Sequence, residues 1–189
     1  MSLEQTVECL SKEMSRLGTG PLAELRRMAV DGPGTADFWR LAARCGFLEY
    51  STDSWMRIVK IMAILTSRGA PAGRRPLHDA ERPLGGVLCD GGHKDWPAAG
   101  AAPRPFLSET RLARLLAQRP DQRAEALERI ARMLVAKRNP EDGINCAQIA
   151  ALLLFPDNEV NLRKLASAYY RRLDTATRRA EAEEEETAA

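Results

Sequence analysis

Apolar residues recur every three or four positions along most of the chain, the spacing of one face of an α-helix. The pattern predicts four helices in the first part of the sequence, over about 3–17, 21–30, 36–46 and 54–69. It predicts four more in the second part, over about 108–119, 121–138, 145–155 and 159–180. No segment alternates between apolar and polar residues as a strand does. We therefore expect an all-α fold, with Trp39 and Trp55 in its core.

Residues 69–105 interrupt this pattern and hold most of the proline and glycine of the chain. Only LGGVLCDG, residues 84–91, is apolar there, which predicts one short helical turn. We expect two small helical bundles, at 1–68 and 106–179, joined by 69–105 as a Gly/Pro-rich linker or irregular loop. The glutamate-rich residues 180–189 are predicted to form a disordered acidic tail.

The charge of the chain is uneven. The formal net charge is +2, but Glu181 and residues 183–186 account for five of the 26 acidic residues. Residues 1–180 therefore carry 28 basic and 21 acidic residues, a net charge of +7, which favours polyanionic partners. Arginine outnumbers lysine 23 to 5. Guanidinium groups grip phosphate bidentately, but a GC-rich coding sequence also enriches arginine, so only its positions can indicate a function.

The cysteines and the apolar runs indicate the cellular compartment of the protein. Cys9, Cys45, Cys89 and Cys146 lie far apart, and no two have the spacing of metal ligands. The N-terminal residues lack the pattern of a signal peptide, and the longest apolar run, 149–155, is too short to span a bilayer. These features predict a cytoplasmic protein with four free thiols and no membrane association.

Some arginines have a carboxylate one helical turn away. Glu125 precedes Arg129 by four residues, and the same spacing joins two further pairs, Glu128 with Arg132 and Glu159 with Arg163. Such pairs stabilise helices, so we assign these three arginines a structural role.

Other basic residues lack such a partner in the sequence. Arg111 and Arg114 lie one turn apart opposite a leucine stripe, and Lys164, Arg171 and Arg178 recur every seven residues. A seven-residue step rises about 10.5 Å on one helix face, which suits successive phosphates along a strand. The residues predicted to bind nucleic-acid backbones are Arg26, Arg27, Arg111, Arg114, Lys164, Arg171, Arg172 and Arg178. Without base-reading companions, they predict contact that is independent of sequence.

Motifs for catalysis are missing from the sequence. The glycine pairs at 85–86 and 91–92 lack the Lys-Ser/Thr ending of a phosphate-binding loop, and His78 and His93 both lie in the irregular middle segment. The acidic pairs fit capping and turns better than a magnesium site. We therefore predict a non-enzymatic protein with no cofactor, no metal and no small-molecule substrate.

An ordered series of segments resembles a known family. The segments are PLAELRRM (21–28), ADFWRLA (36–42), WMRIVKIMAILTSRG (55–69), PLGGVLCDGG (83–92), FLSETRLARLLAQR (106–119) and LRKLASAYYRRL (162–173). In this order, over roughly residues 5–175, they resemble the small subunit (CasB family) of Cascade, the type I-E CRISPR interference complex. The insertion around 93–105 and the glutamate tail depart from the family pattern.

The resemblance implies two helical bundles, present as two copies in the complex, without catalytic activity. It implies partners: the backbone subunits that hold the guide RNA, the large subunit, the second copy, and the backbones of guide RNA, target DNA and displaced DNA in the R-loop. Base pairing reads sequence in such a complex, so the protein only holds backbones in a positive channel. The residues that match the family's basic positions are Arg26 and Arg27, Arg111 and Arg114, and Arg171 and Arg172, with Lys60 and Arg68 as weaker candidates.

Two other functions fit parts of the pattern. A helical DNA-binding transcriptional regulator would use the turn around 156–158, but the helix that follows is basic rather than mixed-polar. A helical scaffold or adaptor without nucleic-acid contact would owe its arginines to coding bias. Operator-specific binding would favour the regulator, and binding insensitive to charge reversal would favour the adaptor.

Overall fold

The computed structural model describes residues 1–48, 51–98 and 100–188. Within them the chain forms nine α-helices and one short 3₁₀ helix, with one isolated bridge between His78 and Ile144. The elements are α1 (Leu3–Arg16), α2 (Thr19–Arg27), α3 (Ala36–Cys45), α4 (Thr52–Leu65), η1 (Pro71–Gly73), α5 (Leu84–Asp90), α6 (Glu109–Ala117), α7 (Pro120–Val135), α8 (Cys146–Leu154) and α9 (Glu159–Ala188). The predicted all-α fold is confirmed.

Local sequence signals explain where several helices begin. The Thr35 hydroxyl accepts a hydrogen bond from the Phe38 amide and caps α3. Asn145 caps α8 in the same way, and α7 begins at Pro120, whose missing N–H costs nothing in a first turn. The N-cap of α4 is Ser51, so this helix begins about two residues before the predicted start near residue 54.

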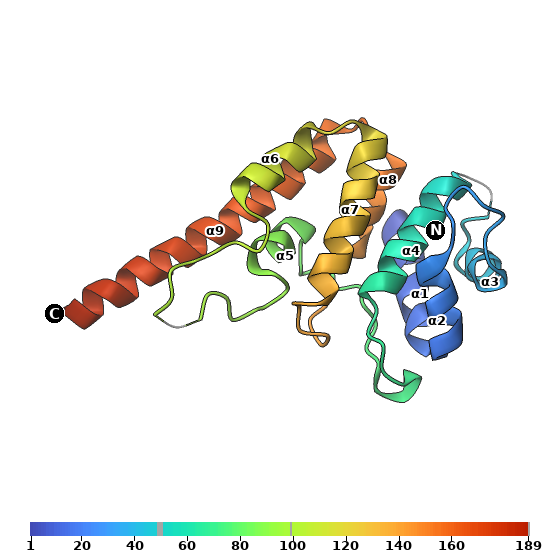
Figure 1. Ribbon diagram of the computed structural model, residues 1–189, viewed down its shortest axis with the longest axis horizontal. Helices are drawn as coiled ribbons and strands as arrows, with labels where there is room; N and C mark the ends of the chain where they lie inside the picture. Colours follow the sequence, from blue (N-terminus) through green and yellow to red (C-terminus); the bar gives the residue numbers. More distant parts are fainter. Residues whose placement is uncertain (49–50, 99, 189) are drawn as a thin grey trace.

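The core is built around α4, whose residues are mostly buried. This helix packs against α1 and α2 from the N-terminal half and against α7 and α8 from the C-terminal half (Figure 1). One cluster of buried apolar side chains runs without a break from Val7 to Tyr169. The expected division into two bundles is therefore not confirmed, because the two halves share their core.

The segment predicted to be a linker contributes a core helix. All seven residues of α5 are buried, and α5 packs along α9. The two helices approach so closely that a Cβ atom at Gly85 would lie 2.0 Å from the Leu165 carbonyl oxygen. The Tyr169 hydroxyl donates to the Leu107 carbonyl at 2.6 Å and holds the end of the segment in place. Residues 84–90 thus belong to the body of the protein.

The acidic tail is helical, which corrects the prediction of disorder. Residues 180–188 continue α9 in one uninterrupted helix, while residue 189 lies outside the described residues. Alanine and glutamate are strong helix formers, and Arg179 pairs with Glu183 one turn later at 2.8 Å. The prediction was wrong because it considered the charge of the run and not its helix propensity.

Two further expectations about side chains are corrected. Cys9 of α1 and Cys45 of α3 form a disulfide, because the fold brings Cα atoms 36 residues apart to 5.7 Å; Cys89 and Cys146 are buried free thiols. Trp55 is buried as expected, but Trp39 is 40% exposed, with its ring N–H donating to the Pro33 carbonyl.

No helix among the described residues is long and apolar enough to cross a membrane.

Candidate nucleic-acid interface

The C-terminal end of α4 is surrounded by arginines that bind its free carbonyl groups. Arg26 of α2 donates to the carbonyls of Ala63 and Thr66 at 2.8 and 2.9 Å. Arg138, which follows α7, donates to the Leu65 carbonyl at 2.7 Å. The last carbonyls of a helix lack partners within the helix, and its C-terminus attracts cations, so this arrangement stabilises the fold.

A basic groove opens beside this helix end, between α2, α4 and α7. It consists of two adjoining hollows of about 500 and 520 Å³ that share Arg68, Arg132 and Val135. The described residues that line it include no aspartate or glutamate and five arginines: Arg26, Arg27, Arg68, Arg132 and Arg138. An open, acid-free hollow with this lining suits an anion.

Two of these arginines are free to bind a ligand. Arg27 and Arg68 are exposed, and neither has a hydrogen-bond or ion-pair partner among the described residues. Arg132 binds Glu128 at 2.6 Å and is therefore partly committed. The groove thus has two free guanidinium groups at its mouth and fixed cations in its wall.

The charge of the fixed cations is not offset, because their hydrogen-bond partners are neutral carbonyls. Burial, followed by the charges of Arg68 and Arg74, lowers the pKa of the Arg26 guanidinium. Burial also lowers the pKa of Arg138. Arginine starts from a pKa above 12, so these groups stay protonated at neutral pH and add positive potential to the groove.

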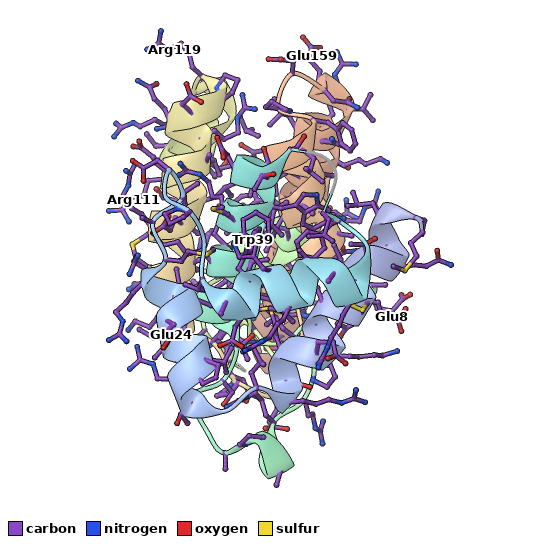
Figure 2. All side chains as sticks on the ribbon, turned by 90° about the vertical axis from the view of Figure 1, so that its right-hand side faces the viewer. Glu8, Glu24, Trp39, Arg111, Arg119 and Glu159 are labelled. Atoms are coloured by element: carbon purple, nitrogen blue, oxygen red, sulfur yellow. A yellow bond between two sulfur atoms is a disulfide. The ribbon has the colours of Figure 1, made fainter. Side chains whose placement is uncertain are left out.

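The predicted pair on α6 is placed as expected. Arg111 and Arg114 are exposed, and the described part of the chain offers neither of them an ion-pair partner. Figure 2 shows Arg111 on the same side of the molecule as α2 and α7.

The three basic residues predicted to share one face of α9 are Lys164, Arg171 and Arg178. Lys164 lines a hollow with Glu4 of α1 and Asn145 before α8. Arg171 is exposed, and Arg178 pairs with Asp174 at 2.9 Å. Arg178 is therefore partly committed, whereas Lys164 and Arg171 are exposed and form no ion pair among the described residues.

Arg172 was predicted to bind a nucleic-acid backbone, but its guanidinium group is committed within the fold. Its side chain is only 25% exposed, and its Nε donates to Asp90 at 2.9 Å. Its Nη2 donates to the carbonyls of His93, Lys94 and Trp96, and its guanidinium lies 5.7 Å from the centre of the Trp96 ring. Asp90 also binds Arg82. Arg172 is turned inward because α5 brings a buried carboxylate beside it, a partner far away in the sequence.

The arginines assigned a structural role are confirmed. Arg129, Arg132 and Arg163 pair with the carboxylates four residues earlier, at 3.7, 2.6 and 2.6 Å. Lys60 shares Glu128 with Arg132 at 3.1 Å, so it is not a free cation. Arg68 is more available than the sequence indicated, whereas Arg26 is less so. Only the capping geometry at the end of α4 distinguishes them, and the sequence contains no clear signal for it.

Comparison with known proteins found no matching family model, no matching curated protein and no matching solved structure.

Proposed function

We propose that this protein is a non-catalytic, nucleic-acid-binding subunit of a cytoplasmic RNA-guided CRISPR complex, of the kind of the type I-E small subunit. The observation that carries the proposal is the basic groove, with Arg27 and Arg68 free at its mouth and no acidic residue among its described lining. Phosphate oxygens are the natural ligands of free guanidinium groups. The α6 pair, Arg111 and Arg114, is also exposed, and Arg111 lies on the same side of the molecule as α2 and α7 (Figure 2).

In this function the groove and the α6 pair hold the sugar-phosphate backbones of guide RNA and target or displaced DNA. The ordered segments that resemble the CasB family support this class over a regulator or an adaptor. Backbone contacts stabilise an R-loop without reading its sequence, because the guide RNA reads it by base pairing.

Charge reversal in the groove tests the nucleic-acid contact. Fluorescence anisotropy would measure binding of a labelled RNA–DNA hybrid to the wild-type chain and to the variant Arg27→Glu with Arg68→Glu. We expect affinity to fall by about tenfold or more, and the slope of log K against log salt to fall by about two.

The matched control reverses Arg40 and Arg163 to glutamate. These arginines are exposed but pair with Asp37 and Glu159, and their reversal changes the net charge equally. We expect it to weaken binding by less than about threefold. Equal losses in both variants would contradict a binding groove and indicate a general effect of net charge.

Purification of the tagged protein from its native cells tests the assignment to a CRISPR complex. We expect short RNAs of uniform length with a constant repeat-derived end, together with several partner subunits. Protein without RNA would favour the adaptor, and genomic fragments sharing one sequence would favour the regulator. In the assembled complex, Arg111→Glu with Arg114→Glu should shorten R-loop lifetime without changing helicity.

A further inference from the structure

The C-terminal end of α9 is acidic and projects from the body of the protein. Residues 180–188 contain five glutamates and no basic residue. Ala176 is buried, and beyond it each residue whose side chain is described is partly or fully exposed. The 12 residues after Ala176 extend about 18 Å along the helix axis, and Figure 1 shows the end of α9 at one extreme of the molecule. The loop after α5 reaches this stretch at Glu183, whose Oε2 accepts from the Gly100 amide at 3.1 Å.

The basic groove cannot be reached by the acidic end of the same chain. Figure 1 places α2 and α4, which border the groove, at the opposite side of the molecule from the end of α9. An uninterrupted helix has no hinge that would let its last turns fold back. Each molecule therefore presents a concentrated negative end and a concentrated positive hollow that do not neutralise each other.

We propose that the acidic end of α9 binds in the basic groove of a second copy of this chain. Charge complementarity carries this choice of partner: one surface has five glutamates in nine residues, of which Glu183 already binds Arg179, and the other is lined by five arginines and no acid among its described residues. Arg27 and Arg68 are free to pair with incoming carboxylates. Exposed Glu181 and Glu185, four residues apart on one helix face, are suited to meet them.

The resulting contact joins different surfaces of the two copies, head to tail. Such a heterologous contact leaves one groove and one acidic end unused in a pair, so further copies can add at either side. The attraction acts between charged groups in contact with solvent, so it weakens with salt. This inference uses the same groove as the proposed function but does not depend on nucleic acid, since self-association is measured with the protein alone.

Sedimentation velocity of the full chain, free of nucleic acid, tests the contact. We expect concentration-dependent association at low salt (about 50 mM), with the dissociation constant raised about tenfold or more at high salt (about 500 mM). A wild-type chain that stays monomeric at low salt over the whole accessible concentration range overturns the proposal.

Two variants and their mixture give the sharper test. The groove variant is Arg27→Glu with Arg68→Glu, and the tail variant is Glu181→Lys with Glu185→Lys. Each variant alone should lose self-association. In the groove variant the new glutamates meet the acidic end of the next copy, and in the tail variant the new lysines meet the arginines of the groove. Mixed in equal amounts they should associate again, since the lysines of one copy meet the glutamates of the other. All four side chains are exposed, and unchanged circular dichroism would verify that both variants fold.

A control variant, Glu81→Lys with Asp157→Lys, makes the same change in net charge at exposed positions outside the acidic C-terminal end of α9. It should associate as the wild type does. A tail variant that associates as strongly as this control, or a mixture that fails to associate, overturns the proposal. If self-association follows these expectations while hybrid binding is unaffected by the groove variant, the proposed function fails and the contact between copies stands.

Discussion

Two clusters of arginine differ in the partners that the fold gives them. Around the end of α4, Arg26 and Arg138 bind backbone carbonyls, and the described lining of the groove contains no carboxylate. Around the end of α5, Arg82 and Arg172 share the carboxylate of Asp90, whose side chain is fully buried. In both clusters the terminal guanidinium nitrogens donate hydrogen bonds, while the Nε atoms of Arg138 and Arg82 are buried without a partner. Only the second cluster also offsets the charge.

This difference decides whether an arginine only stabilises the fold or also keeps a positive charge that can attract a ligand. A carbonyl accepts a hydrogen bond without neutralising the donor, so the first cluster keeps a positive field that reaches the free Arg27 and Arg68. A buried carboxylate cancels one of the two charges beside it and fixes the loop after α5, because Arg172 also binds three carbonyls there. An arginine count alone cannot distinguish the two situations.

The largest expected loss of stability comes from disturbing the close packing of α5 on α9, which places Asp90 beside Arg172. In Gly85→Ala the added Cβ would lie 2.0 Å from the Leu165 carbonyl oxygen and 2.8 Å from the Tyr169 nitrogen. We expect a loss of about 4 kcal/mol or more in the free energy of unfolding, measured by urea denaturation. The neighbouring Gly86→Ala has Pro83 Cγ as its nearest contact, at 3.7 Å, and should be neutral or stabilising. Similar losses in both would contradict this packing.

Removing the buried carboxylate should have the next largest effect. Asp90→Asn leaves Arg82 and Arg172, which are 14% and 25% exposed, without a counter-charge. We expect a loss of about 3 kcal/mol in unfolding free energy. The control Asp174→Asn breaks the exposed pair with Arg178 and should cost less than about 1 kcal/mol. Hybrid binding at the groove should change in neither variant.

Replacing a carbonyl-bound arginine should affect stability and binding together. Arg26→Met removes two hydrogen bonds to the end of α4 and should cost about 1–2 kcal/mol in unfolding free energy. It also removes a fixed charge from the groove wall, so hybrid affinity should fall by about twofold to fivefold at low salt. A loss of stability with wild-type affinity would show that the capping arginines do not contribute to the field.

The smallest effect is expected from Glu128, the carboxylate bound to Arg132 at the border of the groove. Burial raises the pKa of Glu128, but the hydrogen bonds and charges of Arg132 and Lys60 lower it by more, so the net shift is downward from 4.5. A lowered folded-state pKa means that the ionised carboxylate stabilises the fold above pH 4.5, and this contribution is lost as pH falls further.

Glu128→Gln should therefore be less stable than wild type at pH 7, with the difference shrinking toward pH 3 in urea denaturation. The variant also releases Arg132, so hybrid affinity should rise by about twofold. A stability difference that does not depend on pH would contradict the ionised state of Glu128.

The helices were largely predictable because helix formation is local. Caps such as Thr35 and the first-turn Pro120 act within a few residues, and so do the pairs that commit Arg129 and Arg163. The end of α9 was mispredicted although its signal is also local, since the run of glutamates was judged by its charge alone.

The site was predictable only in part. Arg111 and Arg114 lack any partner in the sequence, and the fold adds none among the described residues, so the prediction of free charges on α6 was right. Arg172 had no partner in the sequence either, yet α5 supplies Asp90 from 82 residues away. The disulfide between Cys9 and Cys45 was missed for the same reason, since it depends on how α1 and α3 pack.

The sequence by itself determined the all-α class, most helix boundaries and an excess of arginine over nearby carboxylates. The tertiary structure alone decided which arginines keep an uncompensated charge, because that depends on whether packing places a carbonyl or a carboxylate beside each guanidinium. It joined the two halves around α4, and it set the basic groove and the acidic helix end on opposite sides of one molecule.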